Sequence, residues 1–330
     1  MTEQRGLLGS PIAMPFCRIW IARVVLRLGI ATCLALALLA CNDKPTKPKP
    51  PAYTGADYIP AWSPDGKTIA YLSEDIIDST GMPDLRIKTI DLGTHAESTV
   101  WHPVGGIGMW DLTWSPDSRW LLFAFEGGIA KMLANGDSLH LVVGGEFLYA
   151  PCWSPVTDTI YFTARIGPNA GVFSVGPWGG DPTIALEGLY GAVRCSSSSD
   201  SIIVSASKPV SGSECLVFGG LSGSPPTDTI ICNLYAVRLL RLGKAQDFVI
   251  FLGTITIDGP YTIYFVSRLD GSARRIIDGS AFDLSPDDST LVVAGTGLSR
   301  GLVLVNLHSG ETCNLTRNSS SKDGCPKATP

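Results

Sequence analysis

The sequence predicts an all-β fold: a β-propeller of six blades, each made of four antiparallel strands. Three observations predict it. A turn motif recurs along the chain, short strand-like segments follow each copy, and the copies are about 44 residues apart on average. Four short strands in a unit of that length are typical of a propeller blade. With 330 residues, 45% of them hydrophobic, the chain is long enough to bury the core of such a domain.

The recurring motif is a tryptophan followed by Ser-Pro and, in most copies, by Asp. Clear copies begin at Trp62, Trp114 and Trp153, and another has Leu284 at the tryptophan position. Proline fixes φ, aspartate accepts hydrogen bonds from nearby backbone, and Gly66 is free to adopt φ > 0, so each copy is expected to form a tight turn after a strand. The predicted turn residues are Trp62, Ser63, Pro64, Asp65, Gly66, Trp114, Ser115, Pro116, Asp117, Trp153, Ser154, Pro155, Ser285, Pro286 and Asp287.

Six such units fill residues 55–319. β-branched and aromatic segments after each turn are expected to form the remaining strands, as in the alternating residues 85–90. Residues 195–204 and 242–251 are decayed copies without the Pro-Asp-Gly turn, so the boundaries of units four and five stay open. One blade cannot bury both of its faces, and neighbouring blades must therefore stack.

The first copy, WSPDGKTIAY at residues 62–71, resembles the WD40-like (PD40) repeat of the TolB β-propeller family. The resemblance covers roughly residues 58–316 and is strongest in units one, two, three and six. It implies a propeller that interacts with proteins of the cell envelope. We therefore expect an envelope protein or peptide as the partner of this chain.

The N-terminal segment is expected to be a lipoprotein signal peptide. A basic region is followed by the apolar residues 28–40, a run shorter than the roughly 20 residues of a membrane-spanning helix. The run ends in Leu-Leu-Ala-Cys, which resembles a bacterial lipobox and implies that Cys41 carries the lipid. The alternative is an uncleaved anchor with an incidental cysteine.

The lipobox interpretation divides the chain into four parts. These are a signal peptide at residues 1–40, a Pro/Lys-rich tether at 41–54, the propeller at 55–319 and a flexible tail at 320–330. Acyl chains on Cys41 would hold the protein at a membrane of the bacterial envelope. Asn42 after the cysteine favours the outer membrane.

Charge and histidine content exclude several classes of partner and cofactor. Residues 1–40 contain four arginines and one glutamate, so their removal changes the formal net charge from −5 to −8. An acidic surface argues against nucleic acid as a partner. The four histidines do not pair at metal-ligand spacings and no Cys-x-x-Cys occurs, so neither a metal nor another cofactor is predicted.

Six cysteines follow Cys41, an even number that permits disulfides in an oxidising compartment. Cys215 and Cys232 are expected on adjacent strands of unit four, either as a cross-strand disulfide or as two buried thiols. Cys152 and Cys195 occupy similar places in successive units and are candidates for a second pair.

Two functions stay open: a non-catalytic binding platform, and a propeller lyase or glycan-active hydrolase with an axial site. No catalytic residue is predicted, because the chain is poor in histidine and only 17% of its residues are charged. The Gly-x-Ser-x-Gly at residues 297–301 is followed by a strand pattern, whereas a nucleophile elbow needs a helix. Trp101 and Trp178 are expected in loops of a binding face, and Trp110 and Trp120 between blades. The binding platform is favoured.

Overall fold

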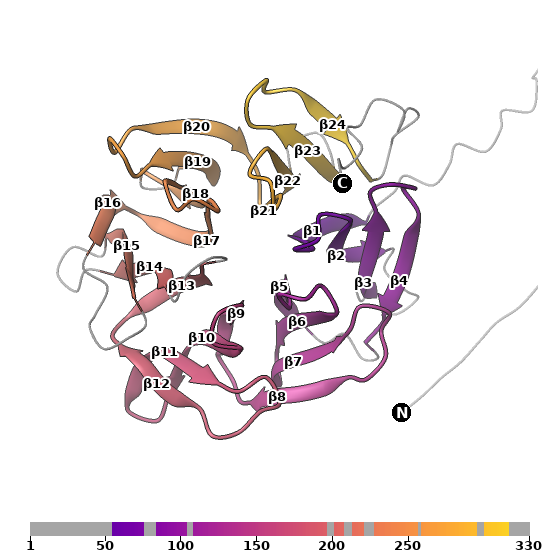
Figure 1. Cartoon of the computed structure of the whole chain (residues 1–330), viewed down its shortest axis with the longest axis horizontal. Coiled ribbons are helices and arrows are strands. Elements are labelled where there is room, and N and C mark those ends of the chain that lie inside the picture. The colour runs from indigo at the N-terminus through magenta and orange to yellow at the C-terminus, as the bar shows by residue number, and fades with distance from the viewer. Residues whose placement is uncertain are drawn as a thin grey trace, which may run out of the picture. The chain divides into compact units, whose positions relative to one another are not determined.

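The computed structural model describes residues 55–75, 84–103, 108–196, 201–207, 213–220, 228–256, 259–295 and 300–316. Within these ranges, 24 strands form six four-stranded sheets, and no residue is helical. The sheets surround a central opening as the blades of a propeller (Figure 1). The predicted fold class and blade number are confirmed.

Several predicted features lie outside the described residues: the signal peptide, Cys41, the tether, the tail, and residues 297–299 of the Gly-x-Ser-x-Gly segment. Among the described residues there is no helix with the length and hydropathy of a membrane span.

The strands follow the chain in order, four to a blade. Blades one to three consist of β1 (Ala56–Trp62), β2 (Thr68–Asp75), β3 (Asp84–Asp91), β4 (Glu97–Trp101), β5 (Met109–Trp114), β6 (Trp120–Phe125), β7 (Gly128–Leu133), β8 (His140–Gly144), β9 (Tyr149–Ser154), β10 (Thr159–Ile166), β11 (Asn169–Val175) and β12 (Thr183–Glu187). Blades four to six consist of β13 (Tyr190–Cys195), β14 (Ser201–Ser207), β15 (Glu214–Gly220), β16 (Asp228–Leu234), β17 (Ala236–Leu242), β18 (Phe248–Thr254), β19 (Thr262–Ser267), β20 (Ala273–Asp278), β21 (Ala281–Leu284), β22 (Thr290–Ala294), β23 (Leu302–Asn306) and β24 (Thr312–Asn314).

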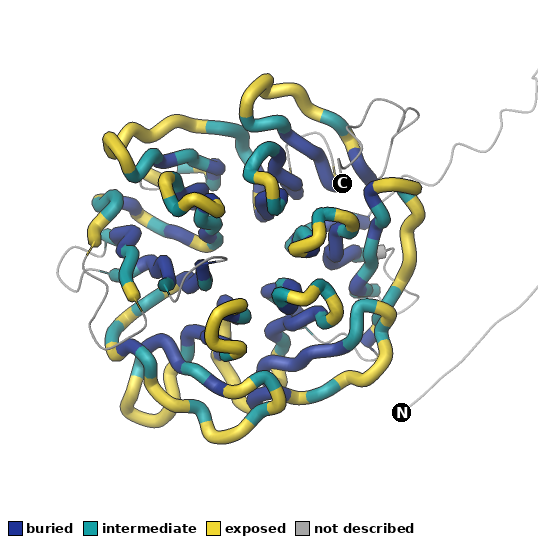
Figure 2. Tube along the Cα trace, in the orientation of Figure 1, coloured by how far each residue is buried: buried dark blue, intermediate teal, exposed yellow. Residues whose placement is uncertain are grey.

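Every blade pairs its strands antiparallel in sequence order, with the first strand nearest the central opening (Figure 1). The six innermost strands are β1, β5, β9, β13, β17 and β21. Each one ends at the turn that leads to the second strand of its blade. In the five blades whose turns the structure describes, these turns lie on one side of the ring, which we call the turn face. Figure 2 shows their exposed residues around the central opening.

Hydrogen bonds of the Ser-Pro-Asp sequence form the first turn. The Ser63 hydroxyl accepts from the Thr68 amide at 2.9 Å and donates to Asp65 Oδ1 at 2.6 Å. Asp65 Oδ1 also accepts from the Lys67 amide at 3.1 Å, and Gly66 adopts φ +76°. Equivalent bonds recur in the turns that begin at residues 115 and 285. A short side-chain network therefore explains why this sequence recurs.

The core consists of six apolar clusters, one between each pair of neighbouring blades. β6 shows how the sequence produces this arrangement. Leu121 and Phe123 belong to the cluster shared with blade one, whereas Leu122 and Ala124 belong to the cluster shared with blade three. Successive side chains of a strand point to opposite faces, so a strand covered on both faces is apolar without alternation.

The ring closes between blades one and six without a shared strand. The Trp62 amide donates to Asp283 Oδ2 at 2.7 Å, and the Asp57 amide donates to the Arg300 carbonyl at 2.7 Å. The Thr316 hydroxyl donates to Asp57 Oδ2 at 2.6 Å. Closure therefore depends on these polar contacts and on the apolar cluster between the two blades.

Candidate functional site

All six blades contribute to a cavity of about 360 Å³ at the turn face of the central opening, which we call the axial mouth. The ends of the innermost strands and the turns after them form its lining. The lining residues are Trp62, Pro64, Thr113, Trp114, Cys152, Trp153, Arg194, Cys195, Arg241, Leu242, Lys244, Asp283, Leu284, Ser285, Pro286 and Asp288. A concave site that gathers aromatic and charged side chains is the usual form of a binding site.

One repeat position supplies much of the chemistry of the axial mouth. It is the residue just before the tryptophan position of the motif, and in chain order it is occupied by Ala61, Thr113, Cys152, Arg194, Arg241 and Asp283. The first three blades therefore contribute small side chains, and the last three contribute charges. Because innermost strands surround one axis, charges separated by 40 residues or more of sequence meet at the mouth.

Asp283 and Arg241 form a satisfied ion pair. Arg241 Nε donates to Asp283 Oδ1, and both side chains are largely buried. Arg241 Nη1 also donates to the Leu240 carbonyl at 2.7 Å. Asp283 accepts from the amides of Trp62 at 2.7 Å and Leu284 at 2.8 Å. The carboxylate therefore connects blades five, six and one, and little of its hydrogen-bonding capacity is left for a ligand.

Arg194 has far fewer partners. Its residue is 7% exposed, and its only hydrogen bond among the described residues runs from Nη1 to the Val193 carbonyl at 3.0 Å. Its Nε is buried without an acceptor, and no described carboxylate lies within ion-pair distance. Burial, followed by repulsion from Arg241, lowers the pKa of Arg194 to about 10, so the guanidinium is charged at neutral pH.

Asp111 places a carboxyl group close enough to interact electrostatically with Arg194, without forming an ion pair with it. It lies on β5, is 9% exposed, and accepts a hydrogen bond from the Ala150 amide at 2.9 Å. Burial raises the pKa of the Asp111 carboxyl, and attraction to Arg194 opposes that rise. Asp111 therefore fixes the start of β9, while Arg194 keeps most of its donors free.

Tryptophan rings and a disulfide surround these charges. The Trp114 indole donates to the Ala61 carbonyl at 2.9 Å, and the Trp153 indole donates to Asp158 Oδ1 at 2.8 Å. With their N–H groups satisfied, the rings contribute apolar surface to the mouth. Cys152 and Cys195 form a disulfide between innermost strands of adjacent blades.

A second aromatic group encloses Lys131 between blades two and three. The Lys131 ammonium is fully buried and lies 3.4 Å from the ring centroid of Trp178, 4.6 Å from that of Trp120 and 5.1 Å from that of Trp153. It has no hydrogen-bond partner among the described residues, and burial lowers its pKa. Cation–π contact explains how a lysine is tolerated there. The space between these three rings is therefore occupied by the side chain of Lys131 itself.

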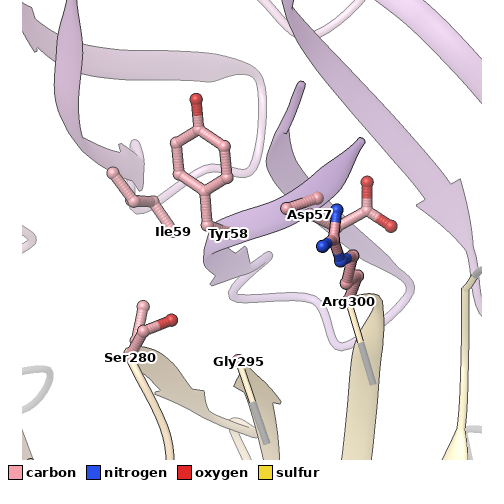
Figure 3. A pocket seen from close by; sticks show the side chains of 8 residues that line it. Asp57, Tyr58, Ile59, Ser280, Gly295 and Arg300 are labelled. Atoms are coloured by element: carbon pink, nitrogen blue, oxygen red, sulfur yellow. The ribbon is translucent and has the colours of Figure 1, made fainter. Parts of the chain in front are cut away.

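Two other cavities lie away from the turn face. One of about 530 Å³ lies where blades one and six meet, lined by residues that include Asp57, Tyr58 and Arg300 (Figure 3). Its buried carboxylate, Asp57, is occupied by the hydroxyls of Ser73 at 2.8 Å and Thr316 at 2.6 Å. Another of about 390 Å³ lies between blades three and four. The axial mouth is smaller, but it is lined by Arg194, which has no ion-pair partner among the described residues.

The structure brings some predicted residues to the axial mouth and places others elsewhere. Trp62, Pro64, Trp114, Trp153, Ser285 and Pro286 line it. Cys215 and Cys232 lie on β15 and β16 and form a disulfide within blade four. Among the described residues, no group of three His, Cys, Asp or Glu side chains is placed to hold a metal ion.

The tryptophans expected in loops divide between two environments. Trp178 lies in the turn between β11 and β12 and is 66% exposed. The loop position predicted for Trp101 is wrong, because Trp101 ends β4 and packs against Phe123 of the next blade, with ring centroids 5.2 Å apart. Trp110 packs into the cluster between blades two and three, as expected.

Sequence reasoning missed Arg194, Arg241 and Asp283. The sequence did mark them. Each one occupies the position just before the tryptophan position of its unit, and the first three units have a small or uncharged residue there. Lys131 had no comparable signal, since its aromatic neighbours come from two different strands and a turn.

Solved structures with the same fold include two TolB proteins. The TolB of Acinetobacter baumannii is 14% identical, with a TM-score of 0.61 over 73% of this chain and 61% of that one. The putative TolB of Agrobacterium tumefaciens is 16% identical, with a TM-score of 0.57 over 69% and 86% of the two chains. A chain of a nidogen/laminin complex is 10% identical, with a TM-score of 0.55 over 69% and 89%.

At these identities, the similarity establishes the propeller fold alone. The chain spans 61% of the length of the A. baumannii TolB. No protein-family model matches the sequence, and no curated protein matches it either.

Proposed function

We propose that this chain is a membrane-anchored lipoprotein of the bacterial cell envelope whose propeller is a non-catalytic binding platform for an envelope protein or peptide. The observation that carries the proposal is the axial mouth, where three tryptophans line the same cavity as Arg194, a buried arginine without an ion-pair partner among the described residues. Tryptophan and arginine are the residues that contribute most at protein interfaces. The TolB-like fold and the lipobox-like sequence before Cys41 support the envelope location.

A binding role accounts for the lining better than catalysis does. The ionisable side chains of the axial mouth are Arg194, Arg241, Lys244, Asp283 and Asp288, and Asp283 is already engaged by Arg241. A lyase or glycan-active hydrolase needs a general acid or base with a pKa suited to proton transfer. Among the described residues that line this cavity there is neither a histidine nor a glutamate, and Asp288 accepts a hydrogen bond from the Lys244 amide at 2.7 Å.

The anchor is tested by the Cys41→Ala variant. Loss of the acyl acceptor removes the buried lipid chains, so we expect the protein to move from the membrane fraction to the soluble fraction. Fractionation of cells that express either form, with immunodetection, measures this. Membrane retention of Cys41→Ala equal to that of the unchanged protein would contradict the lipoprotein assignment.

The binding role is tested by capture of partners from detergent-solubilised envelope. We expect the wild-type chain to retain a discrete protein, and an excess of soluble propeller to compete for it. A matched variant, Trp153→Ala, removes one ring of the axial mouth and should weaken capture. Capture that is unchanged by Trp153→Ala would place the binding surface elsewhere.

A further inference from the structure

Arg194 lines the axial mouth, and the described residues leave most of its N–H donors without a partner. A guanidinium has five N–H donors, and in Arg194 one of them reaches the Val193 carbonyl. The Nε–H group is buried without an acceptor. Leaving a buried charged donor unsatisfied is costly, so native structures rarely do it without a function.

The neighbouring residues show why the fold does not supply the missing partner. The repeat-equivalent Arg241 has Asp283 as its acceptor, whereas Asp111 acts on Arg194 only at a distance and is bonded to the Ala150 amide. The side chain that follows Arg194, Cys195, is held in a disulfide with Cys152. The structure therefore pairs one arginine of the ring internally and leaves the adjacent one for an external acceptor.

The net charge of the cavity lining indicates how many negative charges the external acceptor of Arg194 carries. Among the lining residues, Arg194, Arg241 and Lys244 exceed Asp283 and Asp288 by one positive charge, and the Asp111 carboxyl, which does not line the cavity, attracts Arg194 from a distance. A single excess charge matches a monoanion better than a dianion. A guanidinium binds a carboxylate through two parallel hydrogen bonds, and nearby indole rings favour a carboxylate attached to an apolar group.

We propose that Arg194 binds a carboxylate group of a peptide partner that enters the axial mouth. This assignment rests on the proposed binding function and names the chemistry that the partner presents. The carboxylate is either the C-terminus of the partner or an Asp or Glu side chain. Both sources offer the same two oxygens to the guanidinium.

Matched small probes test the assignment on the full chain. N-acetyl-leucine and N-acetyl-leucine amide differ only in the carboxylate, and N-acetyl-aspartyl-leucine amide carries it on a side chain. We expect the best carboxylate probe to bind at least about tenfold more tightly than the neutral amide, because a charge-assisted bond to Arg194 distinguishes them. Titrations followed by tryptophan fluorescence and by the NMR signal of the arginine Nε–H measure this.

Three variants identify the residue that binds the carboxylate. Arg194→Met should abolish the preference for carboxylates, whereas Arg275→Met, at an exposed arginine of β20, should keep it. Arg194→Lys keeps the charge but not the two-pronged geometry, and should bind with intermediate affinity. Melting temperatures establish that each variant is folded, and Arg194→Lys remains informative if Arg194→Met does not fold.

Several outcomes would overturn the proposal: equal binding of acid and amide, a preference that survives Arg194→Met, or no binding of any carboxylate. Sulfate that binds as tightly as the carboxylates would reveal a general inorganic anion site and would also overturn it. Failure of this proposal can be distinguished from failure of the proposed binding function. Partner capture without carboxylate preference leaves the platform intact, whereas carboxylate binding without a captured partner leaves the Arg194 chemistry intact.

Discussion

Ser115 shows how one hydroxyl specifies a turn. It is 1% exposed, and its Oγ accepts from the Trp120 amide at 2.9 Å while donating to Asp117. Replacement by alanine leaves a buried amide without an acceptor. We expect Ser115→Ala to lower the free energy of unfolding by about 1–3 kcal/mol.

Urea denaturation measures this loss. Ser138→Ala is the matched control, because Ser138 is exposed and its hydroxyl has no hydrogen bond among the described residues. A loss at Ser115 no larger than that at Ser138 would show that the backbone alone determines the turn.

Asp111 provides a pH-dependent prediction at the same scale. Its carboxyl pKa is raised in the folded state, so the folded state binds more protons than the unfolded state between the two pKa values. The penalty for burying the charge is absent below the ordinary carboxyl pKa of 3.8 and fully present above the folded pKa. Asp111→Asn keeps an acceptor for the Ala150 amide and does not titrate.

We therefore expect the free energy of unfolding of Asp111→Asn, relative to wild type, to be higher at pH 7 than at pH 4. Denaturant titrations of both proteins at both pH values measure the difference. A difference that grows in favour of the variant as pH falls would contradict the account, because it would require a lowered pKa at Asp111.

At the scale of elements, the turns explain which blades the sequence reveals. The turn between β17 and β18 has no serine, proline or aspartate at the motif positions, yet the Gly243 amide still donates to the Phe248 carbonyl and Gln246 adopts φ +61°. The backbone bonds that define the turn thus persist after the reinforcing side chains are lost. Blade five was consequently found from its strand pattern and its spacing alone.

The two disulfides formed between described cysteines differ in the elements that they join. Cys152–Cys195 connects the innermost strands of blades three and four across 43 residues, and Cys215–Cys232 connects neighbouring strands of one blade across 17. A crosslink restricts the unfolded chain more when its loop is longer. We expect removal of the first to cost about 4 kcal/mol and of the second about 3 kcal/mol.

Denaturation of the double variants Cys152→Ala/Cys195→Ala and Cys215→Ala/Cys232→Ala compares the two losses, and intact-mass analysis with and without reductant establishes that both bonds form. Free thiols at these positions in protein purified under non-reducing conditions would contradict the pairing. A larger loss for the second pair would show that local strain or packing outweighs loop length.

At the scale of the molecule, closure of the ring creates the site. The repeat and its spacing predicted six blades, because each unit contains its own turns and strands. The charge distribution at the axis was not predicted, since Arg194, Arg241 and Asp283 lie in three different units and meet only when the ring closes. Local patterns determine the blades, whereas the site depends on contacts between distant units.

The same ring predicts where a partner binds. Exposed turn residues surround the central opening on the turn face, and Trp62, Trp114 and Trp153 line the axial mouth there, while outer strands such as β24 and β12 present exposed residues to solvent. A photo-reactive amino acid at Pro286 lies at the axial mouth, and one at Ile184 of β12 lies on the exposed outer edge.

Crosslinking in intact cells from these two positions tests the central claim most directly. The account predicts a discrete crosslinked protein from position 286, none from position 184, and loss of the position 286 product when Arg194 is replaced by methionine. A product from position 184 alone, or equal products from both, would contradict a binding site at the axial mouth.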